Sequence, residues 1–124
     1  MEQSKCSCSC SETAEKVVMC CSGASDVGQI SDLVARKFRD SKERGMKCLT
    51  MVAIDNKPLI ESLKTANVLV IDGCPIDCGK KIMDRAGITN YAYMRVTDHG
   101  LNKGASPANE ANVAHIHEIA KTYC

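Results

Sequence analysis

Apolar residues along the chain fall into four short runs that predict β-strands. The runs cover residues 16–20, 46–48, 67–72 and 91–96. The third run is continuously apolar rather than alternating, which is typical of a parallel strand that is covered on both faces. The end of the second strand is left open, because apolar residues continue beyond Cys48 as far as Ile54.

Between and after these runs, apolar residues recur at the spacing of an amphipathic helix. The predicted helices cover residues 27–44, 58–64, 75–86 and 113–123. Ser25 or Asp26 is expected to cap the first helix and Gly45 to end it. Pro75 is expected to open the third helix, since proline is well tolerated in a first helical turn, and the polar segment 98–109 is expected to be a loop.

Alternating strands and helices with short links predict a three-layer α/β fold, with a mostly parallel four-stranded sheet and helices on both faces. We expect the strand order 2-1-3-4. Ligand sites in such sheets lie beyond the carboxyl ends of the strands, here at the switch between strands one and three. Residues 16–124 are expected to form one domain, and the small, polar residues 1–15 a flexible, cysteine-rich arm.

Charge and composition narrow the classes of function. The chain has 124 residues with 16 Lys and Arg, 15 Asp and Glu, a formal charge of +1, three Tyr, one Phe and no Trp, which argues against nucleic-acid binding. Its longest aliphatic run is too short to cross a bilayer, and its amino terminus has no apolar signal sequence. We therefore expect a cytoplasmic protein that neither binds nor spans a membrane, and unpaired thiols with metal or redox chemistry.

Four of the nine cysteines follow the carboxyl ends of neighbouring strands. Cys21 follows the first strand, Cys48 ends the second, and Cys74 and Cys78 follow the third. These side chains are expected to share one edge of the sheet, and the i,i+4 spacing places Cys74 and Cys78 on one helix face if the helix already includes Cys74. Four thiolates are the ligand set of a closed zinc site, although an iron–sulfur cluster takes the same ligands.

A four-cysteine zinc site has no open position for water, so we expect a metal- or thiol-dependent module rather than a turnover enzyme. Such a module is expected to act on a protein partner, which the sequence does not identify. The alternative from another class is a thiol–disulfide oxidoreductase or sulfur-transfer protein that uses Cys74 and Cys78, activated by the amino terminus of the third helix. An iron–sulfur protein is a third hypothesis.

The remaining cysteines suggest a second metal site or a thiol relay. Cys20 is expected to point away from Cys21, because successive side chains of a strand alternate between its faces. Three further thiols alternate with serines in the arm, at Cys6, Cys8 and Cys10. Cys124 is expected to be a frayed, exposed thiol.

Two further groups of polar residues bear on the site. Asp72 is expected to accept hydrogen bonds from backbone amides of the following turn rather than to bind metal, since a carboxylate is a harder ligand than a thiolate. His115 and His117 are two residues apart in a predicted helix and therefore diverge by ~200°. They are not expected to bind one metal ion together.

Four segments of the chain resemble the DGC domain family of zinc-binding proteins, named for its Asp-Gly-Cys step. The segments are residues 21–29, 46–49, 71–78 and 96–100, and the resemblance covers roughly residues 17 to 103. The resemblance implies a prokaryotic protein whose zinc ligands are Cys21, Cys48, Cys74 and Cys78. It implies no particular activity, and Cys20 and the three cysteines of the arm lie outside the family pattern.

Overall fold

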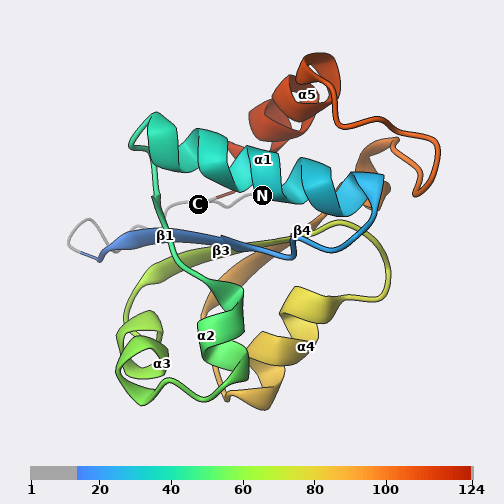
Figure 1. The fold of residues 1–124 in the computed structure, drawn as a ribbon. Coiled ribbons are helices and arrows are strands. Elements are labelled where there is room, and N and C mark those ends of the chain that lie inside the picture. The colour runs from blue at the N-terminus through green and yellow to red at the C-terminus, as the bar shows by residue number, and fades with distance from the viewer. Residues whose placement is uncertain (1–13, 124) are drawn as a thin grey trace.

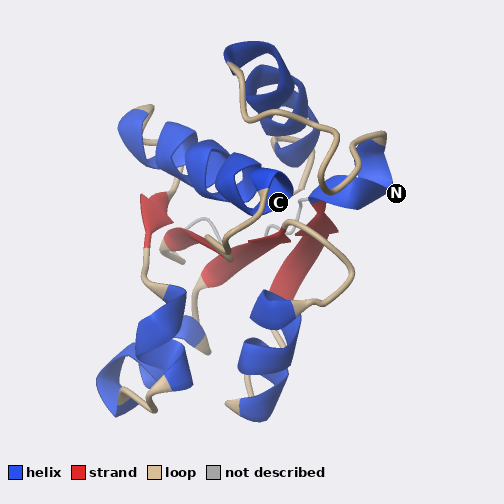
Figure 2. Cartoon of the chain, turned by 45° about the vertical axis from the view of Figure 1, so that its right-hand side comes forward, coloured by secondary structure: helices blue, strands red, loops and turns tan. Residues whose placement is uncertain are grey.

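A computed structural model describes residues 14–123 as a four-stranded, all-parallel sheet between two layers of helices (Figures 1 and 2). The strand order is β2-β1-β3-β4, which confirms the α/β fold and the order expected from the sequence. The strands are β1 (Lys16–Cys20), β2 (Gly45–Met46), β3 (Asn67–Asp72) and β4 (Tyr91–Arg95).

Helices cover both faces of the sheet. Figure 1 shows α1 and α5 on one face and α2, α3 and α4 on the other. Their bounds are α1 (Asp26–Asp40), α2 (Leu49–Ala53), α3 (Lys57–Leu63), α4 (Cys78–Arg85) and α5 (Glu110–Ala120), and a 3-10 helix, η2 (Val96–His99), follows β4. None of the helices within residues 14–123 is long and apolar enough to cross a membrane.

The central strand β3 is buried on both faces, as its unbroken apolar run predicts. Leu69 and Ile71 contribute to the core beneath α1 and α5, whereas Val68 and Val70 contribute to the core beneath α2, α3 and α4. The register pairs Val68 with Val17 of β1. Each apolar side chain of β3 therefore stabilises one of two separate cores.

Helix α1 begins as expected but ends earlier. The Ser25 side chain accepts a hydrogen bond from the Gly28 N–H at 3.1 Å. The prediction that Gly45 ends this helix is wrong, because the helix ends at Asp40 and Lys42 turns the chain with a positive φ of 65°. Gly45 is instead the first residue of β2.

The apolar residues after the second predicted strand, whose end was left open, form the short helix α2, which the sequence did not predict. Strand β2 ends at Met46, so Cys48 does not end the strand as expected and instead precedes the first turn of α2. The reason is visible in the spacing of the buried residues Leu49 and Val52, which is that of a helix rather than of a strand.

The helix expected from Pro75 begins three residues later, at Cys78. Residues 73–77 form a turn, and Asp77 adopts a left-handed conformation with φ 61° that a continuous right-handed helix excludes. Cys74 is therefore not helical, and the expected i,i+4 placement of Cys74 and Cys78 on one helix face is wrong.

A buried arginine joins the strands at the edge of the sheet opposite the carboxyl ends. The Arg44 side chain, 6% exposed, donates hydrogen bonds to the carbonyls of Val17 at 2.9 Å, Asn67 at 3.0 Å and Tyr123 at 3.4 Å. Burial lowers the pKa of Arg44 to about 10, which still leaves the guanidinium charged at neutral pH.

The segment 98–109, expected as a loop, begins within η2 and then follows an irregular path to α5. It is attached to the start of α1, because the Asp26 carboxylate accepts hydrogen bonds from the N–H groups of Gly104 at 2.9 Å and of Ser106 at 3.0 Å. The loop is thereby held beside the carboxyl edge of the sheet.

Candidate functional site: a cavity lined by cysteines

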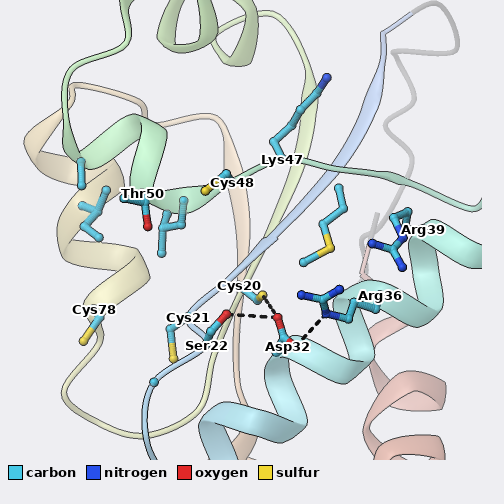
Figure 3. Close-up of a pocket in the computed structure, with 15 residues that line it drawn as sticks. Cys20, Cys21, Ser22, Asp32, Arg36, Arg39, Lys47, Cys48, Thr50 and Cys78 are labelled. Carbon is cyan, nitrogen blue, oxygen red and sulfur yellow. Dashed lines mark hydrogen bonds and ion pairs between the residues drawn. The ribbon is translucent and has the colours of Figure 1, made fainter.

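A cavity of about 580 Å³ lies at the carboxyl ends of β1 and β2 (Figure 3). Four thiols from three parts of the chain line it, namely Cys20, Cys21, Cys48 and Cys78. Cys20 and Cys21 come from the end of β1, Cys48 precedes α2, and Cys78 begins α4 after β3. The fold thus brings three of the four predicted zinc ligands to one cavity.

The fourth predicted ligand, Cys74, lies elsewhere at this edge. Its partly buried side chain packs against the core beneath α1 and α5, and its Sγ is 3.8 Å from Nζ of Lys103. Cys74 is not among the residues that line the cavity. Within residues 14–123, no three His, Cys, Asp or Glu side chains are grouped closely enough to hold a metal ion.

Cys21 lies in the turn after β1, at the junction with β3. Its Sγ is 3.8 Å from Oγ of Ser31, and its backbone N–H donates to the carbonyl of Ile71 at 3.1 Å. Burial raises the pKa of the Cys21 thiol, while the nearby Gly73 N–H acts in the opposite direction. The Asp72 carboxylate also raises this pKa.

Cys20 is the most buried of the four thiols, at 6% exposure. Burial and the Asp32 carboxylate, whose Oδ1 is 3.8 Å from Sγ, raise the pKa of Cys20 to about 12. Cys20 and Cys21 both line the cavity, although their sulfurs point in different directions (Figure 3). Cys21 lies beyond the end of β1, where the alternation of side chains along a strand no longer applies.

Cys48 is exposed at the rim of the cavity, immediately before α2. Its side chain makes no capping hydrogen bond, but the backbone N–H groups of Met51 and Thr50 lie close enough to lower the pKa of the thiol. Cys48 is therefore the thiol of this cavity whose surroundings favour the nucleophilic thiolate form.

Cys78 is positioned by a network of hydrogen bonds beneath α4. The Asp72 carboxylate accepts bonds from the N–H groups of Gly79 at 2.8 Å and Lys80 at 3.1 Å and from the Tyr93 hydroxyl at 2.7 Å. This confirms the expectation that Asp72 binds backbone amides of the turn. The network fixes the first turn of the helix that begins at Cys78.

The turn between Asp72 and Cys78 is also held by β4. The Arg95 guanidinium forms two hydrogen bonds of 2.8 Å with the Asp77 carboxylate, and both side chains are partly buried. These bonds, together with the Tyr93 hydroxyl, lower the pKa of the Asp77 carboxyl against the opposing effect of its desolvation. The left-handed conformation of Asp77 is thus stabilised by a charged partner from a distant strand.

The two histidines of α5 do not meet at a common site, as their spacing predicts. His115 Nε2 lies 3.3 Å from the carbonyl oxygen of His99, whereas the buried His117 pairs with Glu43 at 3.0 Å and packs against Phe38. The cysteines predicted for a second site in the arm, Cys6, Cys8 and Cys10, lie outside the described residues, as does Cys124.

The family model of the DGC domain matches residues 17–122. The chain belongs to the DGC domain family. The Asp-Gly-Cys step of this family is the turn that connects β3 to α4, and its glycine lies against the backbone of α1.

A relative of this DGC domain is the anaerobic and virulence modulator AnvM of Pseudomonas aeruginosa. The two sequences are 28% identical over 88 residues, which cover 70% of this chain and 67% of AnvM. No solved structure matched the chain.

Sequence reasoning missed the cationic side chains of the cavity. Arg36 and Arg39 reach it from α1, and Lys47 reaches it from the segment after β2. In the sequence these residues resemble ordinary charges on exposed surfaces. Only the packing of α1 beside the ends of β1 and β2 brings them to the thiols.

Proposed function

We propose that this DGC domain is a thiol-dependent binding module that holds zinc at the carboxyl edge of its sheet. The proposed ligands are Cys21, Cys48, Cys74 and Cys78. The observation that carries the proposal is the meeting of Cys21, Cys48 and Cys78 in one cavity from three separate elements. Thiolates are soft ligands that suit zinc better than the harder divalent ions.

Two features fit this proposal least: the three thiols that line the cavity are not grouped closely enough to hold a metal ion as they stand, and Cys74 lies outside the cavity lining. Zinc binding through Cys74 requires its Sγ to leave the side chain of Lys103 and reach the cavity. Cys20 already lines the cavity and is the substitute fourth thiol. The proposal therefore includes a rearrangement when metal binds, as is common when a metal site forms together with its fold.

Metal analysis of the full chain purified under anaerobic conditions tests this proposal. We expect about one zinc per chain, as a closed four-thiolate site requires. Cys48→Ser and Cys78→Ser should reduce the zinc content, whereas the matched variant Cys124→Ser should not. Comparison of Cys74→Ser with Cys20→Ser identifies the fourth ligand.

Protein that contains neither zinc nor iron, with all of its thiols open to alkylation, contradicts metal binding altogether. A coloured sample that contains iron and acid-labile sulfide instead supports an iron–sulfur cluster on the same thiols.

A second candidate function is thiol–disulfide exchange at Cys48. Its support is the exposure of this thiol and the backbone amides of Met51 and Thr50, which lower its pKa. The alternative pair from the sequence, Cys74 and Cys78, has less support, because Cys74 does not line the cavity. AnvM is named as a modulator, and by analogy we propose a regulatory, cytoplasmic role with a protein partner rather than metabolic turnover.

A further inference from the structure

The wall of the cysteine cavity carries an excess of positive charge. Arg36, Arg39 and Lys47 line it, and Asp32 is its single carboxylate. Asp32 is already engaged, since it accepts hydrogen bonds from Nε of Arg36 at 2.8 Å and from the Ser22 hydroxyl at 3.1 Å (Figure 3). Arg36 and Asp32 largely offset each other, which leaves Arg39 and Lys47 as the cations available to a ligand.

The present partners of these two cations are weakly bound. Arg39 pairs with Asp40 at 3.0 Å and Lys47 pairs with Glu15 at 3.5 Å, and all four side chains are well exposed. Exposed ion pairs of this kind contribute about 0–1 kcal/mol and are readily exchanged. An anion that enters the cavity can therefore take the place of either carboxylate at little cost.

The remaining wall suits a small molecule with an apolar part. Met46, Leu49 and Ile82 contribute apolar side chains, and the volume of about 580 Å³ lies within the range of small-molecule sites, about 300–1,000 Å³. Cys48 is adjacent to Lys47 in the chain and presents its sulfur at the rim. The exposed thiol and the two cations thus line the same cavity, with the Lys47 side chain extending away from the Cys48 sulfur (Figure 3) and pairing with Glu15.

We propose that the cavity binds an anionic low-molecular-weight thiol in its disulfide form, with Arg39 and Lys47 attracting its carboxylates and Cys48 as the reacting thiol. The inference rests on the second candidate function, exchange at Cys48, and adds the class of substrate. It does not require zinc.

The reaction conserves atoms and electrons. The thiolate of Cys48 attacks one sulfur of the ligand disulfide, the sulfur–sulfur bond of the ligand breaks, and a mixed disulfide with Cys48 forms. The other half of the ligand leaves as a thiolate and takes a proton from water. Cys48 is oxidised, and the released half of the ligand is reduced.

The test compares two disulfides of opposite charge on the full chain, in the presence of a chelator so that bound metal does not mask the thiols. The probes are glutathione disulfide, which is anionic, and cystamine, which is cationic. The rate of mixed-disulfide formation at Cys48 is measured for each probe by mass spectrometry of alkylated, digested protein.

The double variant Arg39→Gln/Lys47→Gln should slow the reaction of Cys48 with glutathione disulfide by about tenfold, since charged walls raise the local concentration of an oppositely charged ligand. The same variant should not slow the reaction with cystamine. Lys37→Gln/Lys57→Gln is the matched control, because it removes two exposed charges outside the cavity lining and should leave both rates unchanged.

Two outcomes separate this inference from the proposals on which it draws. If Cys48 exchanges with both probes and the cavity variant alters both rates equally, the thiol chemistry stands and the anionic substrate class is wrong. If glutathione disulfide modifies other cysteines and leaves Cys48 free, the choice of Cys48 as the reacting thiol is wrong as well. Zinc content is measured independently and decides neither outcome.

Discussion

The Asp72 carboxylate accepts a hydrogen bond of 2.8 Å from the backbone N–H of Gly79. Asp72 is the last residue of β3 and is 1% exposed, and Gly79 is the second residue of α4. A Cβ atom at Gly79 would lie 2.7 Å from Oδ1 of Asp72, so the approach is possible only for glycine. The aspartate of the Asp-Gly-Cys step therefore fixes the start of the helix that presents Cys78.

Replacement of Asp72 by Asn should destabilise the fold by about 1–3 kcal/mol, because an amide cannot accept from Gly79, Lys80 and Tyr93 as the two carboxylate oxygens do. Urea unfolding followed by circular dichroism measures the change. The alkylation rate of Cys78 should rise at the same time, since the first turn of α4 loses its anchor.

Asp84→Asn is the matched control for this change. Asp84 also accepts a hydrogen bond from a tyrosine hydroxyl, that of Tyr91 at 2.6 Å, but the pair is exposed. We expect its effect on the free energy of unfolding to be within about 0.5 kcal/mol. Equal effects of the two substitutions would argue against a special role for the buried carboxylate.

The glycine of the same step is required by a close contact with α1. A Cβ atom at Gly73 would lie 2.7 Å from the backbone N of Gly28 and 2.7 Å from the carbonyl carbon of Val27, which are rigid parts of the helix. Gly73→Ala should therefore cost about 1–3 kcal/mol, the usual cost of overpacking a buried site. Thermal unfolding of the variant measures this cost.

Gly45→Ala serves as the control, because a Cβ at Gly45 meets its nearest neighbour at an ordinary 3.7 Å. The variant should unfold close to the wild-type temperature. A Gly73→Ala protein of unchanged stability would show that the turn and α1 can move apart freely.

The attachment of the loop 98–109 to α1 should weaken in acid. Hydrogen bonds from the N–H groups of Gly104 and Ser106 lower the pKa of the Asp26 carboxyl below its ordinary value of 3.8. The charged carboxylate therefore stabilises the folded state fully above that value, and this contribution disappears as the pH falls through the lowered pKa. Thermal unfolding between pH 2 and pH 7, a range of about five units around these values, follows the loss.

Asp26→Asn should lower the unfolding temperature at neutral pH and remove this part of the acid dependence. Asp40→Asn, at the other end of the same helix, should retain it. Parallel pH profiles for the wild type and Asp26→Asn would contradict the role of Asp26.

The thiols of the cavity should differ widely in reactivity. Burial and Asp32 raise the pKa of Cys20 to about 12, whereas the amides of Met51 and Thr50 lower the pKa of Cys48. At neutral pH, iodoacetamide should label Cys48 at least ~100-fold faster than Cys20, because only the thiolate reacts and Cys20 is also inaccessible. Site-resolved mass spectrometry gives both rates.

Labelling in concentrated guanidinium chloride provides the control, since both thiols then react at similar rates. If Cys20 and Cys48 were alkylated at comparable rates in the folded protein, the end of β1 would open as often as the rim of the cavity.

The positions of the strands follow from local sequence, because an apolar run such as that of β3 can be satisfied only by burial on both faces. The turn after β3 could not be predicted in the same way. Pro75 is compatible with a first helical turn, but the conformation of Asp77 is stabilised by Arg95, 18 residues further along the chain. The helix accordingly starts at Cys78, and Cys74 lies in the preceding turn, outside the cavity lining.

Similarly, sequence reasoning could predict only some of the residues that line the cavity. The expected strand order brings Cys21, Cys48 and Cys78 to one edge, and this much follows from topology. The positive charge on the cavity wall depends on how α1 packs over the sheet, because Arg36 and Arg39 reach the cavity from the exposed side of this helix. No local pattern distinguishes these arginines from solvated charges elsewhere on the surface.

Because of the hydrogen bonds of Arg44, we expect the amino and carboxyl edges of the sheet to differ in how well they tolerate changes to the chain. One guanidinium holds the carbonyls of Val17, Asn67 and Tyr123 at the amino rim, so an insertion there breaks bonds to three segments at once. The cavity lies at the carboxyl edge of the sheet, away from the hydrogen bonds of Arg44. The loops beside the cavity are instead joined in pairs, Asp77 to Arg95 and Asp26 to Gly104, so the exchange of one of these loops disturbs one other segment rather than three.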